Sequence, residues 1–305
     1  MGVADRFYTP GMDTTNDGIE VDYVEHVLPI AGVDVHVYEW TAGRTPKGVV
    51  HIAHGAGDHA RRYQRLANAL VERGYAVVAA DQLGHGRTGV GFLGLSNVGP
   101  GGMPATRALL RETILWTRAR YRGIPLIGLG HSWGSILSQQ LFARDATIFD
   151  GLVLTGSTLV LPGFINTGDF NAQWAGDGHG MSWISRDVAE VQAMIDDLYG
   201  FDIADSSVWT PLGAVQLLTP PPMPRFGRAA RVPVLVQSGA EDVIGYGARG
   251  PRALAWAYRH VTRMRDVTLH IYPEARHEVF NELNRDEVTG HLLDWLAWHF
   301  EMPER

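Results

Sequence analysis

A glycine-flanked serine between an apolar run and a helical stretch is the feature that most constrains this chain. Residues 130–134 read GHSWG; they follow the apolar run 125–129 and precede residues 135–144, whose pattern predicts a helix. A strand, a G-x-S-x-G turn and a helix together form a nucleophile elbow. A serine on so sharp a turn takes a strained backbone conformation, and side chains at Gly130 and Gly134 would collide with it. The pattern therefore predicts a nucleophilic Ser132 hydroxyl at the top of a sheet, rather than an ordinary glycine-rich turn.

Segments typical of strands alternate with amphipathic helical patterns over most of the chain. The alternation predicts an α/β fold with a mostly parallel eight-stranded sheet flanked by helices. The short turn at Ala31 and Gly32 predicts that the first two strands form an antiparallel hairpin at one edge. The expected strands are residues 21–28, 33–40, 48–53, 75–80, 125–130, 151–155, 232–238 and 267–272, and the expected helices include 61–73, 105–121, 250–261 and 286–300.

One stretch, from about residue 159 to residue 225, departs from this alternation. It is rich in large apolar residues but contains no evident strand. An insertion after the sixth strand lies above the carboxyl ends of the sheet, where ligands bind in such folds. We therefore expect a first core segment at 1–156, a helical cap at 157–227 and a second core segment at 228–305. Most apolar residues of the cap are expected to form a small core of its own.

Composition excludes several classes of function. The formal net charge of −7 and the pI near 6.0 give no basic footprint for nucleic acid. The chain contains no cysteine, which excludes disulfides, thiol nucleophiles and thiolate metal sites and fits a reducing cytoplasm. The first 17 residues lack the pattern of a signal peptide, and no apolar run is long enough to span a bilayer. We expect a cytoplasmic monomer or homodimer.

A serine hydroxyl needs a base to take its proton and a third group to orient that base. Among thirteen histidines, His277 follows the last predicted strand, so its loop leaves the sheet on the side of the elbow. His131 adjoins the serine in sequence, and we expect its side chain to point elsewhere.

The orienting acid is expected after the strand 232–238, which leads to Glu241 and Asp242. We favour Asp242, because a strand followed by Gly-x-x-acid returns the fourth residue over the sheet edge; Glu241 remains the alternative. The resulting order Ser132, Asp242, His277 is that of the α/β-hydrolases and differs from both main serine-protease orders.

An oxyanion that forms at the attacked carbonyl needs preorganised N–H donors. In this fold one donor is the residue after the nucleophile, here Trp133, and the other comes from the loop after the third strand. That loop reads HGAGDH over residues 54–59, and Ala56 is the expected donor. The loop 81–88 also carries histidine, but its spacing matches no zinc motif, so we expect it to support the site. The chemistry requires no metal and no cofactor.

Several separated blocks resemble the monoacylglycerol lipase and lysophospholipase group of the α/β-hydrolase superfamily, also called the serine aminopeptidase S33 or Hydrolase-4 group. The resemblance extends from about residue 32 to the C-terminus. Members often have Met after the serine where this chain has Trp133, Glu where it has Asp58, and Ser where it has Arg87 and Thr88. The blocks are residues 54–59 with Arg62 and Tyr63, 81–86, 130–134, 185–187, 239–242, and 275–278 with Asn281 and Glu282.

The resemblance implies a serine carboxylic-ester hydrolase that acts through an acyl-enzyme on medium- or long-chain acyl esters. The acyl chain would lie under the cap. The residues expected to line the substrate pocket are His54, Phe164, Ile165, Trp174, Met181, Trp183 and Ile184.

Other functions stay open at this point. The cap is acidic, which disfavours docking on anionic lipid and weighs against a lysophospholipase, leaving at most peripheral lipid contact. A hydrolase of a xenobiotic or aromatic ester, such as a phthalate monoester, is an alternative, because Trp133 suggests an altered pocket. C–C bond hydrolases, acyltransferases, a peptidase and a non-catalytic ligand receptor use the same fold. The acidic cap residues are Asp169, Asp177, Asp187, Glu190, Asp196, Asp197, Asp202 and Asp205, and over the same stretch the only Lys or Arg is Arg186.

Overall fold

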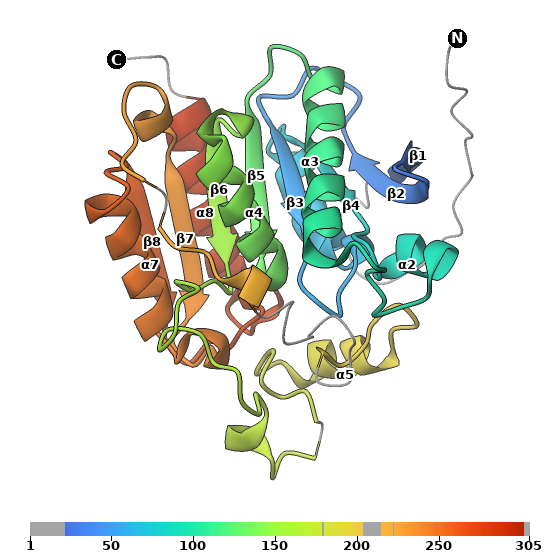
Figure 1. Cartoon of the computed structure of the whole chain (residues 1–305), viewed down its shortest axis with the longest axis vertical. Coiled ribbons are helices and arrows are strands. Elements are labelled where there is room, and N and C mark those ends of the chain that lie inside the picture. Colours follow the sequence, from blue (N-terminus) through green and yellow to red (C-terminus); the bar gives the residue numbers. More distant parts are fainter. Residues whose placement is uncertain (1–21, 179, 204–214, 222, 302–305) are drawn as a thin grey trace.

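A computed structural model describes residues 22–178, 180–203, 215–221 and 223–301. One eight-stranded sheet forms its centre, with the strand order β1-β2-β4-β3-β5-β6-β7-β8 (Figure 1). Strand β1 pairs antiparallel with β2, and β2 pairs antiparallel with β4. The remaining neighbours in this order, β4-β3-β5-β6-β7-β8, all pair in parallel, which confirms the predicted sheet. The strands are β1 (Tyr23–Ile30), β2 (Val33–Trp40), β3 (Val49–Ala53), β4 (Ala76–Ala80), β5 (Leu126–His131), β6 (Gly151–Thr155), β7 (Val234–Gly239) and β8 (Val267–Tyr272).

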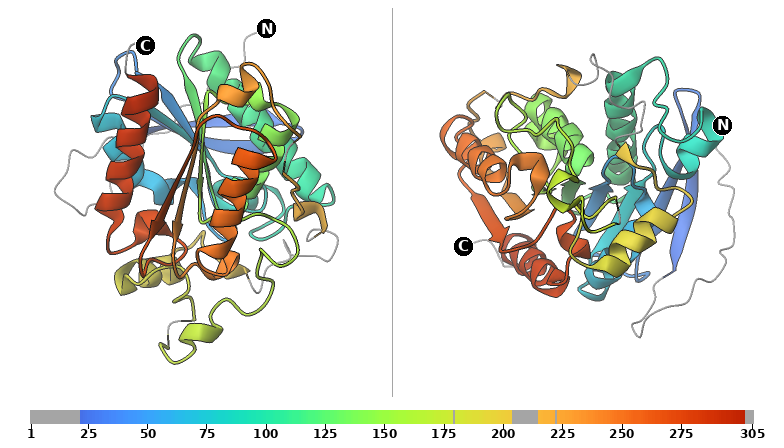
Figure 2. Two further views of the ribbon diagram at one scale, coloured as in Figure 1. Left: turned by 90° about the vertical axis from the view of Figure 1, so that its left-hand side faces the viewer. Right: turned by 90° about the horizontal axis from the view of Figure 1, so that it is seen from below.

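Helices cover both faces of the sheet (Figure 2). Successive residues of a strand point to opposite faces. On β3, Val49 belongs to the core that contains Leu137 of α4, whereas Val50 belongs to the core that contains Leu292 of α8. Burial on both faces explains why the central strands read as continuous apolar runs. The described helices are α1 (Gln64–Glu72), α2 (Gly86–Phe92), α3 (Gly102–Arg120), α4 (Ser132–Arg144), α5 (Val188–Asp196), α7 (Arg249–His260) and α8 (Arg285–Phe300).

Short 3-10 turns account for some differences from the predicted helices. The helix predicted from residue 61 begins with the turn η1 (Ala60–Tyr63), which leads into α1. Helix α2 was not predicted, because three glycines among its seven residues weaken the helical pattern. The other 3-10 turns are η2 (Ala146–Ile148), η3 (Ala172–Trp174), η5 (Ala229–Arg231), η6 (Val243–Gly245) and η7 (Val279–Asn281). The predictions for residues 1–17, Val21 and Asp205 concern positions outside the described residues.

Among its described residues, the segment between β6 and β7 contains α5, the 3-10 turns η3 and η5 and a helical turn at 215–217, and no strand. Figure 1 shows α5 and the loops before it beyond the end of the sheet at which β5 leads into α4. Side chains of this segment form a separate core, as expected, which includes Trp174, Met181, Ile184 and Met194. The segment therefore lies over the carboxyl ends of the parallel strands.

Candidate active site

Ser132 sits on the sharp turn that the sequence predicts. Strand β5 ends at His131 and α4 begins at Ser132, whose φ of +50° lies in the left-handed region. A Cβ on Gly130 would lie 2.6 Å from Cα of Ser135, and a Cβ on Gly134 would overlap the carbonyl oxygen of Ala53. Both glycines are therefore required for the turn to pack against its neighbours.

A buried histidine–carboxylate pair lies at the same end of the sheet. Nδ1 of His277 is 2.9 Å from Oδ1 of Asp242, and both side chains are buried. Oδ1 also accepts a hydrogen bond from the backbone N–H of Ile244 at 3.0 Å, which fixes the carboxylate. Nε2 of His277 is buried and has no hydrogen-bond partner within the described part of the chain. With Nδ1–H donating to the carboxylate, the lone pair on Nε2 is free to take a proton.

Two aromatic rings hold the imidazole of His277. The ring centroid of His131 lies 4.8 Å away and that of Trp183 lies 5.0 Å away. The expectation that His131 points elsewhere is therefore wrong: its Nδ1 lies 3.1 Å from Oγ1 of Thr155, and this contact turns the ring onto His277. Burial, aided by the neighbouring His277, lowers the pKa of His131 to about 4, so its ring is neutral near pH 7.

The loop after β3 lies directly against the serine. A Cβ on Gly55 would be 3.2 Å from Cβ of Ser132, and Ala56 follows it in the chain. On the other side, Trp133 is the second residue of α4, and the first four N–H groups of an α-helix have no partner within the helix. Backbone N–H groups from both segments are thus available beside the serine.

Two buried histidines, His54 and His85, join the loop after β3 to residues 81–88, for which we expect a supporting role. The N–H of Gln82 donates to Nε2 of His54 at 3.0 Å, and the N–H of Gly57 donates to Nε2 of His85 at 3.1 Å. Burial lowers the pKa of both rings, to about 3 for His85, so that each Nε2 remains an acceptor.

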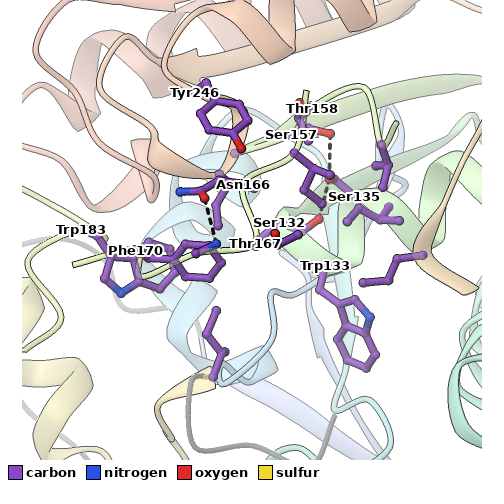
Figure 3. Close-up of a pocket in the computed structure, with 18 of the residues that line it drawn as sticks. Ser132, Trp133, Ser135, Ser157, Thr158, Asn166, Thr167, Phe170, Trp183 and Tyr246 are labelled. Atoms are coloured by element: carbon purple, nitrogen blue, oxygen red, sulfur yellow. Dashed lines mark hydrogen bonds between the residues drawn. The ribbon is translucent and has the colours of Figure 1, made fainter. Parts of the chain in front are cut away.

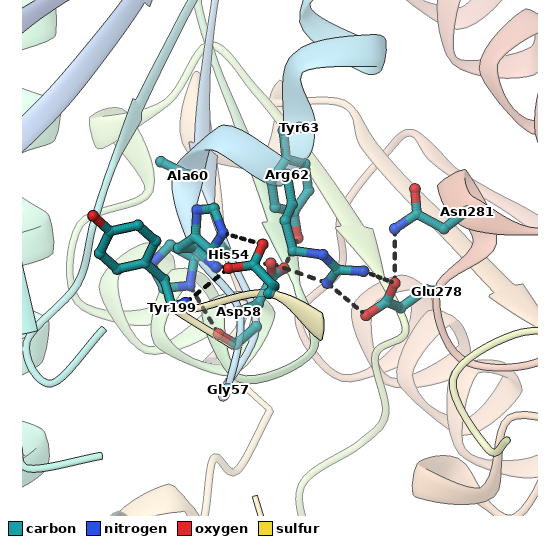
Figure 4. Close-up of polar contacts among 12 residues, drawn as sticks. His54, Gly57, Asp58, Ala60, Arg62, Tyr63, Tyr199, Glu278 and Asn281 are labelled. Atoms are coloured by element: carbon teal, nitrogen blue, oxygen red, sulfur yellow. Dashed lines mark hydrogen bonds and ion pairs between the residues drawn. The ribbon is translucent and has the colours of Figure 1, made fainter. Parts of the chain in front are cut away.

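Arg62 joins the loop after β3 to the residue that follows His277 (Figure 4). Its guanidinium donates to both carboxylate oxygens of Glu278, at 3.1 and 3.0 Å, and to Oδ1 of Asp58 at 3.1 Å. Tyr63 donates to Oδ2 of Asp58 at 2.9 Å. Burial opposes ionisation of both carboxyls, but the positive charge of Arg62 outweighs it and holds the pKa of Asp58 and of Glu278 below their usual values. The two loops are therefore joined by a buried ionic contact.

A cavity of about 910 Å³ opens over Ser132. Its size lies in the range of ligand pockets. Figure 3 shows Ser132 among the lining side chains, with Phe170 and Trp183 to one side and the ring of Trp133 to the other. Further lining residues include Ile136, Val160, Ile165, Asn166, Asp169, Asp202, Ile203, Leu217, Leu218, Ile244 and Tyr246.

Two of the seven predicted pocket residues, Ile165 and Trp183, line this cavity. His54 does not, because it is fully buried and its ring nitrogens bond to the backbone of Gly55 and Gln82. The other four predictions were also wrong. Trp174, Met181 and Ile184 pack in the core of the segment itself, and Phe164 lies under the guanidinium of Arg249.

The cavity residues Phe170, Ile203, Leu217 and Tyr246 were not predicted as lining. Phe170 is one of the large apolar residues between residues 159 and 225, so the apolar composition of that stretch made it a candidate. The others lie in or beside loops, where no periodicity assigns a side chain to a face.

The described residues include no group of three histidine or acidic side chains that could hold a metal ion. None of the helices in the described ranges is long and apolar enough to cross a bilayer.

Comparisons with known proteins agree with this geometry. The family model described as "Serine aminopeptidase, S33" matches residues 44–284, more than half of the chain. A monoacylglycerol lipase of Mycolicibacterium smegmatis is 27% identical over 88% of this chain and 95% of its own length. A monoglyceride lipase of Rattus norvegicus is 28% identical over 92% of this chain and 90% of its own length.

The fold is also found among solved structures. A carboxyl esterase from Bacillus coagulans superposes with a TM-score of 0.79 at 21% identity, covering 92% of this chain and 99% of that one. This likeness shows the α/β-hydrolase fold. By the family match, the chain belongs to the serine aminopeptidase S33 family of the α/β-hydrolases.

Proposed function

We propose that the protein is a serine carboxylic-ester hydrolase of the monoacylglycerol lipase kind, acting on medium- or long-chain acyl esters. The observation that carries the proposal is the buried Asp242–His277 pair, whose Nε2 has no hydrogen-bond partner among the described residues. The imidazole packs against the ring of His131, the neighbour of Ser132 in the elbow. Two curated relatives named monoacylglycerol or monoglyceride lipase, alignable over about nine tenths of both chains, support the ester class.

In this mechanism Oγ of Ser132 attacks the ester carbonyl while its proton passes to Nε2 of His277. The alcohol leaves with that proton, and the acyl group remains on Ser132. A water molecule then attacks the acyl-enzyme and loses a proton to Nε2 of His277. His277 returns that proton to Oγ of Ser132 as the carboxylic acid is released. Asp242 orients the imidazole and stabilises the imidazolium form.

The backbone N–H groups of Ala56 and Trp133 are the proposed donors to the oxyanion. Each such donor is worth on the order of 3 kcal/mol of the barrier. The contact between Gly55 and Ser132 and the position of Trp133 in the first turn of α4 support this assignment.

Residues 157–227 are the proposed cap, between core segments 1–156 and 228–305. Hydrogen bonds from this segment to both loops of the site support that division. The N–H of Phe201 donates to the carbonyl of Gly57 at 3.1 Å, and the N–H of Glu278 donates to the carbonyl of Ile184 at 2.7 Å.

We also propose that the protein is cytoplasmic. The chain contains no cysteine, a composition compatible with the reducing conditions of that compartment.

Hydrolysis of p-nitrophenyl esters from acetate to palmitate, with 1-monoacylglycerols alongside, tests the function in wild type and Ser132→Ala. We expect a maximum at medium or long chains, turnover of monoacylglycerols, and loss of both in the variant. A preference for acetate without monoacylglycerol turnover would replace the lipase assignment with a short-chain or specialised esterase. Turnover that survives in Ser132→Ala would remove the serine mechanism.

A further inference from the structure

The charges around the cavity are of one sign. Asp169 and Asp202 line it, whereas no Lys or Arg is among its described lining residues. Over the whole cap, residues 157–227, eight acidic residues stand against two arginines, Arg186 and Arg225, and neither is among the described residues that line the cavity. A substrate chain that enters the cavity therefore meets apolar and aromatic surface, carboxylates, and neutral hydroxyl and amide groups. Of these neutral groups, the hydroxyls of Ser135 and Thr158 already donate to the carbonyl oxygens of Ser132 and Phe164.

The arginines of the cap and of the loops beside the active site contact other groups. Arg186 donates through Nε to Glu282 at 2.9 Å, with Glu274 also in ion-pair range. Arg276 donates to the carbonyl oxygens of Ser182 and Ser185, and its guanidinium lies over the ring of Trp174.

Two further arginines complete this set. Arg62 is divided between Asp58 and Glu278, and Arg249, on the first turn of α7, lies over the ring of Phe164. Neither is among the side chains that line the cavity.

Resting on the proposed ester hydrolysis, we propose that this cavity selects substrates by charge. It accepts esters whose acyl or alcohol chain is neutral or cationic, and it rejects chains that carry a free carboxylate. Moving an anion from water into an apolar cavity costs several kcal/mol unless a cation or several donors compensate. A cationic group loses water too, but carboxylates and aromatic faces attract it.

Asp169 is the lining residue through which this selection is tested. It lies next to Phe170, whose ring centroid is 5.2 Å from that of Trp183, so that an acid and two aromatic rings share one wall. Oδ1 of Asp169 accepts a hydrogen bond from the N–H of Asn171 at 2.8 Å. The carbonyl oxygen of an asparagine accepts the same bond, so Asp169→Asn removes the charge and keeps the turn.

This selection has a consequence for the candidate substrates. Monoesters of dicarboxylic acids, such as a phthalate monoester, keep a free carboxylate at neutral pH. They therefore fall outside the expected range, whereas neutral esters, including monoacylglycerols, fall within it.

Three p-nitrophenyl esters of equal chain length test the proposal, with tert-butyl, trimethylammonium or carboxylate as the terminal group. At pH 7.5 and low ionic strength we expect kcat/KM for the carboxylate ester to be about 100-fold below that of the tert-butyl ester. The trimethylammonium ester should stay within about tenfold of the neutral one. A carboxylate ester within threefold of the neutral one, or equal losses for both charged esters, would overturn the charge selection.

The variants Asp169→Asn and Asp196→Asn separate the cavity charge from the charge of the cap as a whole. Asp169 and Asp196 are both exposed, but Asp196 lies on α5 and does not line the cavity, and its replacement changes the net charge equally. Asp169→Asn should lower the ratio of cationic to anionic turnover about threefold at low salt, whereas Asp196→Asn should not change it. Equal effects of the two variants would contradict a role for the cavity wall.

Failure of the proposed function has a different signature, because all three esters would then remain intact. Binding of the same esters to Ser132→Ala, measured by calorimetry, tests the charge order without turnover. Binding in the order neutral, cationic, anionic supports the selection even in that case. Equal affinity for the anionic and neutral esters would overturn it.

Discussion

Asp242 holds Nδ1 of His277 at 2.9 Å inside the protein, while the side chain of its neighbour Glu241 is exposed. The contact favours Asp242 over Glu241 as the orienting acid. We predict that Asp242→Asn lowers kcat by about 10⁴, because an asparagine stabilises the wrong tautomer of the imidazole. Glu241→Gln should stay within twofold of wild type. Kinetics on one p-nitrophenyl ester compare the two, and a large loss in Glu241→Gln alone would reverse the assignment.

Because Gly156 has no side chain, the ring of His277 can pack directly against its backbone. A Cβ there would lie 2.8 Å from Cε1 of His277, and the φ of +52° already disfavours a side chain. Gly156→Ala should shift the imidazole and lower kcat about 100-fold, since small misplacements of catalytic groups cost that much. Gly227→Ala is the matched control: its φ is +58° and nothing lies within 4 Å of its Cβ position. Equal activity of the two variants would show that the contact with His277 is unimportant.

Arg62 compensates two buried carboxylates at once. Replacing it with Met leaves Asp58 and Glu278 without their cation, so we predict a loss of about 3–5 kcal/mol in the free energy of unfolding. Arg65→Met removes the more exposed pair with Glu190 and the hydrogen bonds to the Phe280 carbonyl and Asn281, and it leaves no buried carboxylate without a cation; it should cost less than about 1 kcal/mol. Urea denaturation measures both. A cost below 1 kcal/mol for Arg62→Met would contradict the contribution of this ionic contact.

Buried neutral histidines predict an acid-sensitive fold. Burial lowers the pKa of His51 and of His85 to about 3 and, with His277, that of His131 to about 4. Unfolding returns each ring to water, where its pKa is about 6.5, so the unfolded chain binds more protons below that pH. The stability that the fold gains by keeping these rings neutral should therefore be at its full value above pH 6.5. It should fall toward pH 5 by up to about 1.4 kcal/mol per pH unit for each histidine.

His51 offers the test of this pH dependence, because it lies in the core and bonds to Oγ1 of Thr117 at 2.9 Å. Between pH 6.5 and 5, His51→Gln should reduce the slope of the free energy of unfolding against pH by up to about 1.4 kcal/mol per pH unit, which corresponds to one proton. Replacement of the exposed His260 by Gln should leave the slope unchanged. An unaltered slope in His51→Gln would show that this ring is protonated in the folded protein.

The sheet was predictable because its strands carry strong local signals. Strands 33–40, 151–155 and 267–272 were predicted with the bounds that the structure has, and the others differ at their ends by one or two residues. Apolar runs buried on both faces and glycine-containing turns mark such strands directly. The elbow was equally predictable from the sequence, because the close approach of neighbouring backbone requires glycine at both Gly130 and Gly134.

The cavity wall was not predictable in the same way. Apolar residues of the cap can face its own core or the cavity, and only tertiary packing decides, as Trp174 and Trp183 show. Trp133 illustrates the same limit. Its ring is 1% exposed, packs 4.9 Å from His85 and donates to Sδ of Met103 at 3.2 Å, so little of it reaches the cavity. The contact of His131 with His277 also depends on Thr155, a residue of another strand.

Labelling with a fluorophosphonate, followed by peptide mass spectrometry, shows whether Ser132 is an activated nucleophile. Such reagents modify serines that a neighbouring base activates, and we expect His277, oriented by Asp242, to activate Ser132 in this way. We predict one label per chain, on the peptide that contains Ser132, and none in Ser132→Ala. A label on a different residue, or no label in a preparation that hydrolyses esters, would contradict the account.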